Sequence, residues 1–259
     1  MIQEFLRHLL TAAPEHIKKM GYLAESIAID ARQARCKAAW TPHLETTKDT
    51  IADECARLGS LDTINVYGAG GLYDVPLERL NLHAATVNLT DIVVLKRARK
   101  LTQGLDHLRL VEHDITEYAK PFYEFLTSSN SRLPDVPMHP DLSLGYKPDL
   151  AISLNLISQL AIPFYGSCEK YGKTCKPEKL HRLLATAHLN GLKALGCPVL
   201  IIADIERVYE ENGQEIDREP ALPPDLLDMP YKSWWWDIAP KGEANRTINI
   251  RHHVGAWRL

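Results

Sequence analysis

Five short apolar runs alternate with helix-like segments between residues 60 and 203, and this alternation constrains the fold more than any other feature of the sequence. Strands that alternate with helices form βαβ units, in which neighbouring strands are parallel. The last run, PVLIIA, is apolar throughout, which is typical of a strand covered on both faces. The sequence therefore predicts an α/β fold with a mainly parallel sheet. The five expected strands are residues 63–67, 85–89, 108–112, 150–154 and 198–203.

The two ends of the chain depart from this alternation. Residues 1–58 repeat apolar side chains at three- and four-residue spacing without a strand-like run, which predicts an N-terminal helical segment. Residues 234–238 and 247–257 are strand-like and are separated by a turn, which predicts a C-terminal antiparallel hairpin. We expect a helical segment over residues 1–59 and a seven-stranded domain over residues 60–259. Individual helices are expected at residues 2–10, after Pro14, and at residues 50–58, 72–82, 92–101 and 181–195.

Composition and charge argue against several classes of protein. Hydrophobic residues make up 45% of the chain and charged residues 24%, which is ordinary for a globular protein. The net charge is −3 and the nearest approach to a basic run is Lys96–Lys100, so we expect no nucleic-acid partner. No secretory signal and no apolar run near the ~20 residues of a membrane span are evident. Five irregularly spaced cysteines indicate reduced thiols, and we expect a cytoplasmic protein.

A glycine cluster follows the first expected strand, in the segment Val66–Leu72 (VYGAGGL). Glycines let the backbone turn sharply and let a ligand approach closely, and the following helix offers free N–H groups. The dinucleotide pattern GxGxxG would require Gly or Ala at position 73, where this chain has Tyr73, so a nicotinamide or flavin site is less favoured. The alternative is a tight turn that binds no ligand.

Acidic residues follow the second and third expected strands. Asp91 lies 21 residues after Gly70, at the carboxyl edge of the sheet, where an acid can accept hydrogen bonds from both hydroxyls of a ribose. The alternative is that Asp91 caps a helix beginning at Ile92. Asp114, with Ile115 beside it, is placed to contact the exocyclic amine of adenine, and a cap or turn is an equal alternative.

This order of elements resembles the class I S-adenosylmethionine methyltransferases over roughly residues 60–259. In more detail, the segments GAGGLYDVPLERL, PDLAISLNLISQL and WWWDIAP resemble an uncharacterised group of proteobacterial methyltransferase-like proteins. The resemblance implies a Rossmann-like fold and S-adenosylmethionine as the cofactor. The family pattern places an acid two residues before the first glycine, where this chain has Val66. The expected cofactor-binding residues are Gly68, Ala69, Gly70, Gly71, Asp91, Asp114, Ile115 and Asn155.

The candidate catalytic residues, Asn155 and Gln159, follow the fourth expected strand. In methyltransferases of this fold that position faces the transferred methyl group, and a polar side chain there can orient a nucleophile. The alternative is that both residues only cap the next helix. The stretch AWTPH, with Trp40 and His43, is expected to reach over the cofactor pocket. The methyl acceptor would then lie between Asn155 and the N-terminal helices. The alternative is that these helices pack on the flank of the sheet.

The sequence thus predicts a methyltransferase that acts on an unknown small molecule or protein side chain. Two alternatives stay open: a catalytically silent domain that binds a nucleoside or a partner protein, and a nicotinamide-dependent oxidoreductase. No metal is expected, because the spacing of Cys168, Cys175 and His181 is not that of a common structural zinc site.

Several polar and aromatic residues near the C-terminus have less defined roles. Residues 204–207 (DIER) are expected at the tip of the fifth strand, as substrate contacts or a structural ion pair. In the expected C-terminal strands, Trp235 should face opposite to Trp234 and Trp236, and His252 opposite to His253.

Overall fold

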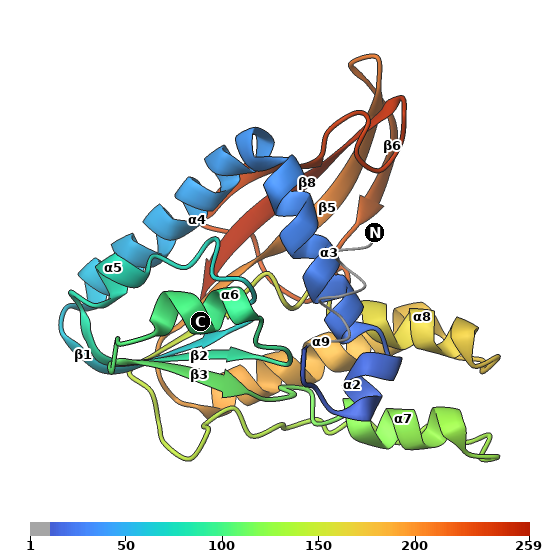
Figure 1. Ribbon diagram of the computed structural model, residues 1–259, viewed down its shortest axis with the longest axis horizontal. Coiled ribbons are helices and arrows are strands. Elements are labelled where there is room, and N and C mark those ends of the chain that lie inside the picture. The colour runs from blue at the N-terminus through green and yellow to red at the C-terminus, as the bar shows by residue number, and fades with distance from the viewer. Residues whose placement is uncertain (1–10) are drawn as a thin grey trace.

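A computed structural model describes residues 11–259 and has an eight-stranded sheet at its centre (Figure 1). The strand order is β3-β2-β1-β4-β5-β8-β7, and β6 pairs with β5 outside this path. Strands β1 to β5 are parallel neighbours, whereas β8 runs antiparallel between β5 and β7. The predicted α/β fold, with its mainly parallel sheet and antiparallel end, is confirmed. The strands are β1 (Leu61–Tyr67), β2 (Ala84–Asp91), β3 (Leu108–Glu112), β4 (Leu150–Leu154), β5 (Val199–Glu211), β6 (Gln214–Pro220), β7 (Lys232–Ala239) and β8 (Ile248–Arg258).

Helices cover both faces of this sheet (Figure 1). They are α2 (Glu15–Lys19), α3 (Tyr22–Arg35), α4 (Lys37–Leu58), α5 (Leu77–Leu80), α6 (Lys96–Thr102), α7 (Ala119–Thr127), α8 (Ile162–Lys170) and α9 (Pro177–Ala194). None of these helices is long and apolar enough to cross a membrane. The expected helix at residues 2–10 lies outside the described residues.

Two hydrophobic cores form, one on each face, because side chains alternate along the central strands. On β5, Ile201 packs into the core formed with α2, α3, α7, α8 and α9, whereas Leu200 and Ile202 pack into the core formed with α4, α5 and α6. The N-terminal helices contribute to both cores, with Leu23 of α3 in the first and Ile51 of α4 in the second. The proposed boundary at residue 59 falls in the turn between α4 and β1, and the division into two units stays a prediction.

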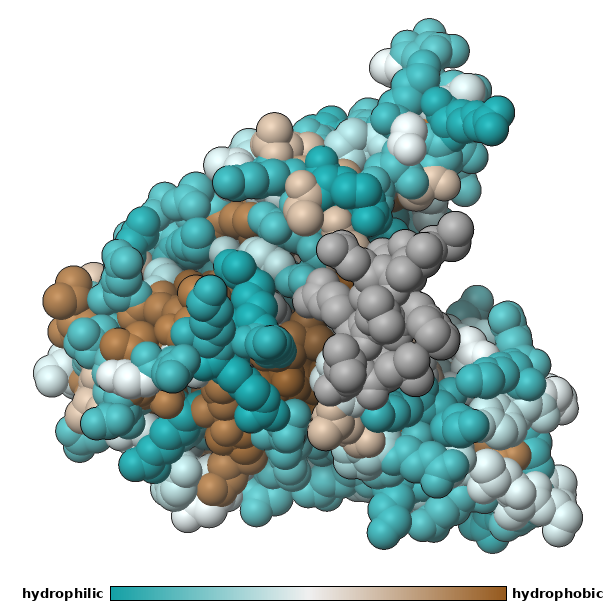
Figure 2. Space-filling view, viewed as in Figure 1, coloured by the Kyte–Doolittle hydropathy of each residue, from teal (hydrophilic) through white to brown (hydrophobic). Residues whose placement is uncertain are grey.

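The strand β5 is longer than the sequence indicated, and residues 204–207 lie inside it. Its pairing with β8 continues to Glu211, which lies opposite Ile248, so the expectation that residues 204–207 form a strand tip is wrong. The extension turns back as β6, which the sequence analysis did not predict. All seven residues of β6 are exposed, and the hairpin surface is mainly hydrophilic (Figure 2). No apolar alternation therefore marked it as a strand.

Two helices begin later than expected. The segment 72–76 is irregular and only α5 is helical, because Pro76 disfavours a helical conformation at Val75. Helix α6 begins at Lys96, and the residues before it, Val93, Val94 and Leu95, form a buried loop. In contrast, α4 begins at Lys37, well before the expected residue 50, and ends at Leu58, with Gly59 at its C-cap as predicted.

Candidate active site

A cavity of about 250 Å³ follows the carboxyl ends of the parallel strands. Its floor comes from the residues that follow β1, β2, β3 and β4, and helices α3 and α4 form the wall above it. Ligands of open α/β sheets bind at this edge. Every expected cofactor-binding and catalytic residue lines this cavity: Gly68, Ala69, Gly70, Gly71, Asp91, Asp114, Ile115, Asn155 and Gln159. The binding roles themselves stay predictions.

The glycine loop is held between the ends of β2 and β4. The N–H groups of Gly68 and Ala69 donate to the carbonyl oxygen of Thr90 at 2.9 and 3.0 Å. Gly68 has a φ of +85°, and a Cβ there would lie 2.5 Å from Leu156 Cγ and closer still to the Leu154 carbonyl oxygen. Only glycine fits at residue 68, because any side chain would be both strained and crowded.

Asp91 closes the glycine loop from the end of β2. Its Oδ2 accepts the Gly70 N–H at 2.8 Å and its Oδ1 accepts the Val93 N–H at 3.2 Å. The alternative that Asp91 caps a helix starting at Ile92 is wrong, because α6 begins at Lys96 without a side-chain cap. Burial raises the pKa of Asp91, although the backbone N–H groups oppose the shift. A carboxylate has about four acceptor sites, so acceptor capacity remains for a ligand.

Asp114 forms the turn that leads into α7. Its Oδ1 accepts the Thr116 N–H at 3.0 Å and the Thr116 hydroxyl at 2.6 Å, and its Oδ2 accepts the Ala119 N–H at 2.8 Å. Asp114 therefore has the cap or turn role that was the alternative to contact with adenine. The same carboxylate also lines the cavity beside Ile115, so contact with adenine remains a prediction.

Asn155 and Asp74 form a polar pair next to the glycine loop. Asn155 has a φ of +52°, and its Nδ2 donates to Asp74 Oδ2 at 2.8 Å. Asn155 Oδ1 is buried and has no partner among the described residues. Burial raises the pKa of Asp74 to about 6, although hydrogen bonds from the backbone and from Asn155 oppose the shift. The sequence analysis placed Asp74 only within the expected helix at residues 72–82, and its position four residues after Gly70 was the one available signal.

The alternative that Asn155 and Gln159 only cap the next helix is wrong. Helix α8 begins at Ile162, its N-cap position is Ala161, and no side chain caps it. Both side chains instead belong to the cavity wall. Val66, which occupies the position of the family's acid, is fully buried in a hydrophobic core and does not reach the cavity.

Trp40 and His43 of α4 lie at the end of the cavity nearest β7. The His43 ring stacks on Trp236, with centroids 4.1 Å apart and an interplanar angle of 8°. Trp40 meets Trp236 edge-on at 4.9 Å, and its Nε1 donates to the Ile238 carbonyl oxygen at 2.9 Å. These residues pack on the sheet and also line the cavity, and the position of the acceptor stays a prediction.

The other side chains of the C-terminal strands alternate as predicted. Trp235 is exposed on the opposite face from buried Trp236 and stacks on His253 at 4.8 Å. His252 is buried, and its Nδ1 lies 3.1 Å from Asp204 Oδ2. Asp204 is fully buried inside β5 beside His252 and is not among the residues that line the cavity, which favours a structural role over a substrate contact.

No protein-family model matches the sequence, and no curated protein matches it. Among solved structures, 1,6-didemethyltoxoflavin-N1-methyltransferase from Burkholderia thailandensis is 16% identical, with 94% of this chain and 90% of that chain covered and a TM-score of 0.44. The N-methyltransferase NodS from Bradyrhizobium japonicum is 13% identical, with coverage of 82% and 96% and a TM-score of 0.37. Magnesium protoporphyrin IX methyltransferase from Synechocystis PCC 6803 is also 13% identical, with coverage of 82% and 79% and a TM-score of 0.39. What each of these proteins binds or methylates is a property of that protein.

Proposed function

We propose that the protein is an S-adenosylmethionine-dependent methyltransferase that acts on a small molecule. The observation that carries this proposal is a glycine loop that is closed by Asp91 and lines a cavity. Asp114 and Asn155 line the same cavity, along one edge of the sheet. The insertion of antiparallel β8 between β5 and β7 fits the same type of fold. A small-molecule acceptor is favoured over a protein side chain because α3 and α4 form a wall over the cavity.

The hydrogen-bond acceptors of the cavity fit the parts of this cofactor. Asp91, which keeps acceptor capacity beyond its backbone partners, suits the ribose hydroxyls, and Asp114 suits the adenine end. We assign the ammonium group of the methionine end to Asp74 and Asn155, whose Oδ1 lacks a partner among the described residues. This pair would supply the acid that the family pattern places at residue 66.

When bound, S-adenosylmethionine supplies an electrophilic methyl group on a cationic sulfonium. The protein's own contribution is then alignment, because methyl transfer requires the reacting atoms to be held ~3–3.5 Å apart. Asn155 and Gln159 stand at the end of β4, where they can orient the acceptor. Helices α3 and α4 exclude water from the site. The five cysteines are free thiols, which fits a cytoplasmic location.

Calorimetric titration with S-adenosylmethionine, S-adenosylhomocysteine and NAD tests the proposal. We expect the first two to bind and NAD not to bind. Asp91→Ala removes two charge-assisted hydrogen bonds to the ribose, each worth about 1.5–3 kcal/mol, so affinity should fall at least about tenfold. Asp62→Ala is the matched control, because Asp62 is exposed at the opposite end of the sheet, where β1 begins.

Unchanged affinity in a folded Asp91→Ala protein would refute the ribose assignment. Tight cofactor binding without methyl transfer to any acceptor would favour a catalytically silent binding domain. Binding of NAD alone would favour the oxidoreductase alternative.

A further inference from the structure

The charge of the cavity disfavours one class of methyl acceptor. None of the described residues that line it is a lysine or an arginine, whereas five of them are acidic: Glu25, Asp30, Asp74, Asp91 and Asp114. Like charges brought together in a partly buried site repel strongly. An acceptor that carries a carboxylate or a phosphate would therefore bind poorly, and a cation or an uncharged molecule would not meet this repulsion.

The tautomer of His43 disfavours a second class of methyl acceptor, the cations. An indole N–H can only donate, and Trp234 Nε1 lies 3.0 Å from His43 Nδ1, so Nδ1 is the acceptor of this hydrogen bond. Burial lowers the pKa of His43 to about 3, so the ring is neutral and carries its single proton on Nε2. His43 is only 1% exposed, and Nε2 has no partner among the described residues. The unpaired group is thus a buried donor, which an ammonium ion cannot satisfy.

The same end of the cavity is lined by aromatic rings and one aliphatic side chain. The rings of Trp40 and His43 both contact Trp236 there, and Leu44 adds an aliphatic surface one turn after Trp40 on α4. In the sheet, Asp114 follows β3 at one edge and Trp236 lies on β7 at the other. Adenosine at Asp91 and Asp114 would therefore leave this far end open.

On the premise of the proposed function, we propose that the Trp40–His43–Leu44–Trp236 end of the cavity binds an uncharged planar methyl acceptor that accepts a hydrogen bond from His43 Nε2. The carboxylates select against anions, and the His43 donor selects against cations at this end. The aromatic rings favour a flat molecule over an extended one. His43 acts here by binding and orienting the acceptor, because its protonated Nε2 cannot take up a proton.

Four bicyclic probes of similar size test this selection on the protein saturated with S-adenosylhomocysteine, with binding read from tryptophan fluorescence and calorimetry. 4-Quinolone is uncharged and offers a carbonyl acceptor, naphthalene offers none, quinoline-4-carboxylate is anionic and 4-aminoquinoline is cationic at neutral pH. We expect 4-quinolone to bind most tightly. Loss of one buried hydrogen bond in His43→Phe should weaken 4-quinolone about five- to tenfold, and leave naphthalene nearly unchanged.

Two further variants and the cofactor itself provide controls. His43→Gln keeps a donor and should recover part of the quinolone affinity. His253→Phe removes a histidine that stacks on Trp235 outside the cavity, and should change nothing. S-adenosylhomocysteine should bind all these variants within about twofold of the wild-type affinity, because its assigned contacts lie elsewhere.

The proposal is overturned if 4-quinolone fails to bind the loaded protein, or if naphthalene or quinoline-4-carboxylate binds as tightly. It is also overturned if His43→Phe weakens all four probes equally. The wild-type comparison decides the question even if a variant does not fold. If S-adenosylhomocysteine itself does not bind, the proposed function fails, and this outcome is distinguishable from failure of the acceptor site alone.

Discussion

Asp74 lies at the cavity wall with its carboxylate held by Asn155 and with Asp91 nearby. Burial and the second carboxylate both favour its protonated form, and Lys48 only partly opposes them. A cation bound beside it would reverse this balance, because an opposite charge favours the ionised carboxylate. Binding of S-adenosylmethionine and deprotonation of Asp74 should therefore be coupled.

We predict that affinity for S-adenosylmethionine falls as the pH drops below 6, the pKa of Asp74 in the free protein. Below that pH, binding must first remove a proton, so the dissociation constant should rise by up to about tenfold per pH unit. Asp74→Asn cannot ionise, and its weaker affinity should vary much less with pH. Calorimetry between about pH 5 and 7, with Asp62→Asn as control, measures the difference. The assignment of the ammonium group is wrong if Asp74→Asn keeps the wild-type pH dependence.

The same residue should affect stability with a defined sign. The pKa of Asp74 in the fold lies above its ordinary value, so the folded state holds the proton more tightly than the unfolded chain. Its favourable contribution is present at low pH and is lost as the pH rises through about 6. Asp74→Asn should accordingly stabilise the cofactor-free protein above that pH, by on the order of 1–3 kcal/mol.

Helix α4 is tied to the C-terminal strands at several points along its length. Trp40 donates to the Ile238 carbonyl oxygen near its start, and Lys232 Nζ donates to Thr50 Oγ1 at 2.8 Å in its second half. Near its end, Glu54 is 1% exposed and accepts Arg258 Nε at 2.7 Å. These ties fix the helix that carries Trp40 and His43 to the cavity wall.

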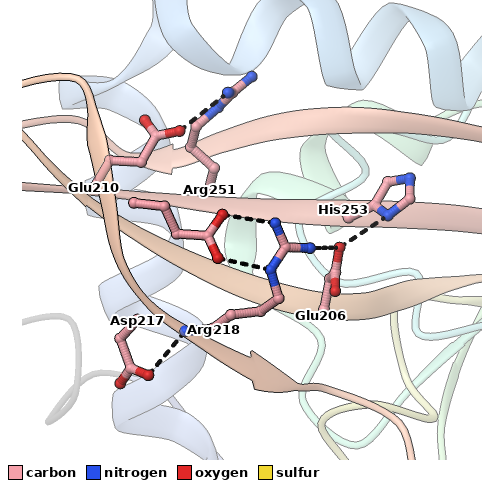
Figure 3. Close-up of polar contacts among 7 residues, drawn as sticks. Glu206, Glu210, Asp217, Arg218, Arg251 and His253 are labelled. Carbon is pink, nitrogen blue, oxygen red and sulfur yellow. Dashed lines mark hydrogen bonds and ion pairs between the residues drawn. The ribbon is translucent and has the colours of Figure 1, made fainter.

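We predict that Arg258→Ala lowers the free energy of unfolding by about 1–3 kcal/mol, because it removes one of the two cations that hold a buried carboxylate. Burial raises the pKa of Glu54, but hydrogen bonds from Arg57 and Arg258 outweigh this and keep the pKa below its ordinary value. Arg218→Ala is the matched control. Arg218 is about as exposed as Arg258, but its carboxylate partners on the β5–β6 hairpin, Glu206 and Glu215, are 21% and 44% exposed, whereas Glu54 is 1% exposed (Figure 3).

The exposed Arg218 network should contribute less than about 1 kcal/mol despite its short distances. Urea unfolding of both variants gives the comparison. An equal loss in the two variants would mean that burial of Glu54 does not strengthen the tie between α4 and β8.

The sequence predicted helices and strands correctly where their apolar periodicity was strong. The five parallel strands and the final two were predicted from it, whereas β6 was missed because all of its residues are exposed. Helices α7 and α8 were also missed, since both are short and carry a proline near their start, at Pro121 and Pro163. The late start of α6 followed from tertiary burial of residues 93–95, which no local pattern specifies.

At the scale of the whole molecule, some residues of the candidate site could be predicted from the sequence and others could not. Residues that end strands, such as Asp91 and Asn155, could be placed because the edge of a parallel sheet collects them. Asp74 and Trp236 could not be placed this way, because their positions depend on an irregular loop and on packing of α4 against β7. Helices α3 and α4 line the cavity from outside the sheet, so the cavity is complete only in the assembled fold.

This dependence on the assembled fold predicts how the molecule responds to its cofactor. At a concentration one hundred times the dissociation constant, S-adenosylhomocysteine should add about 2.7 kcal/mol to the free energy of unfolding. For a chain of this size, that corresponds to a rise of roughly 5–10 °C in the melting temperature.

Amide hydrogen exchange should slow most in the glycine loop, the turn at Asp114 and α3, all of which line the cavity. The β5–β6 hairpin extends beyond the sheet with an exposed outer strand, so its amides should exchange by local fraying at an unchanged rate. Protection that rises in the hairpin and not in α3 would place the ligand outside this cavity.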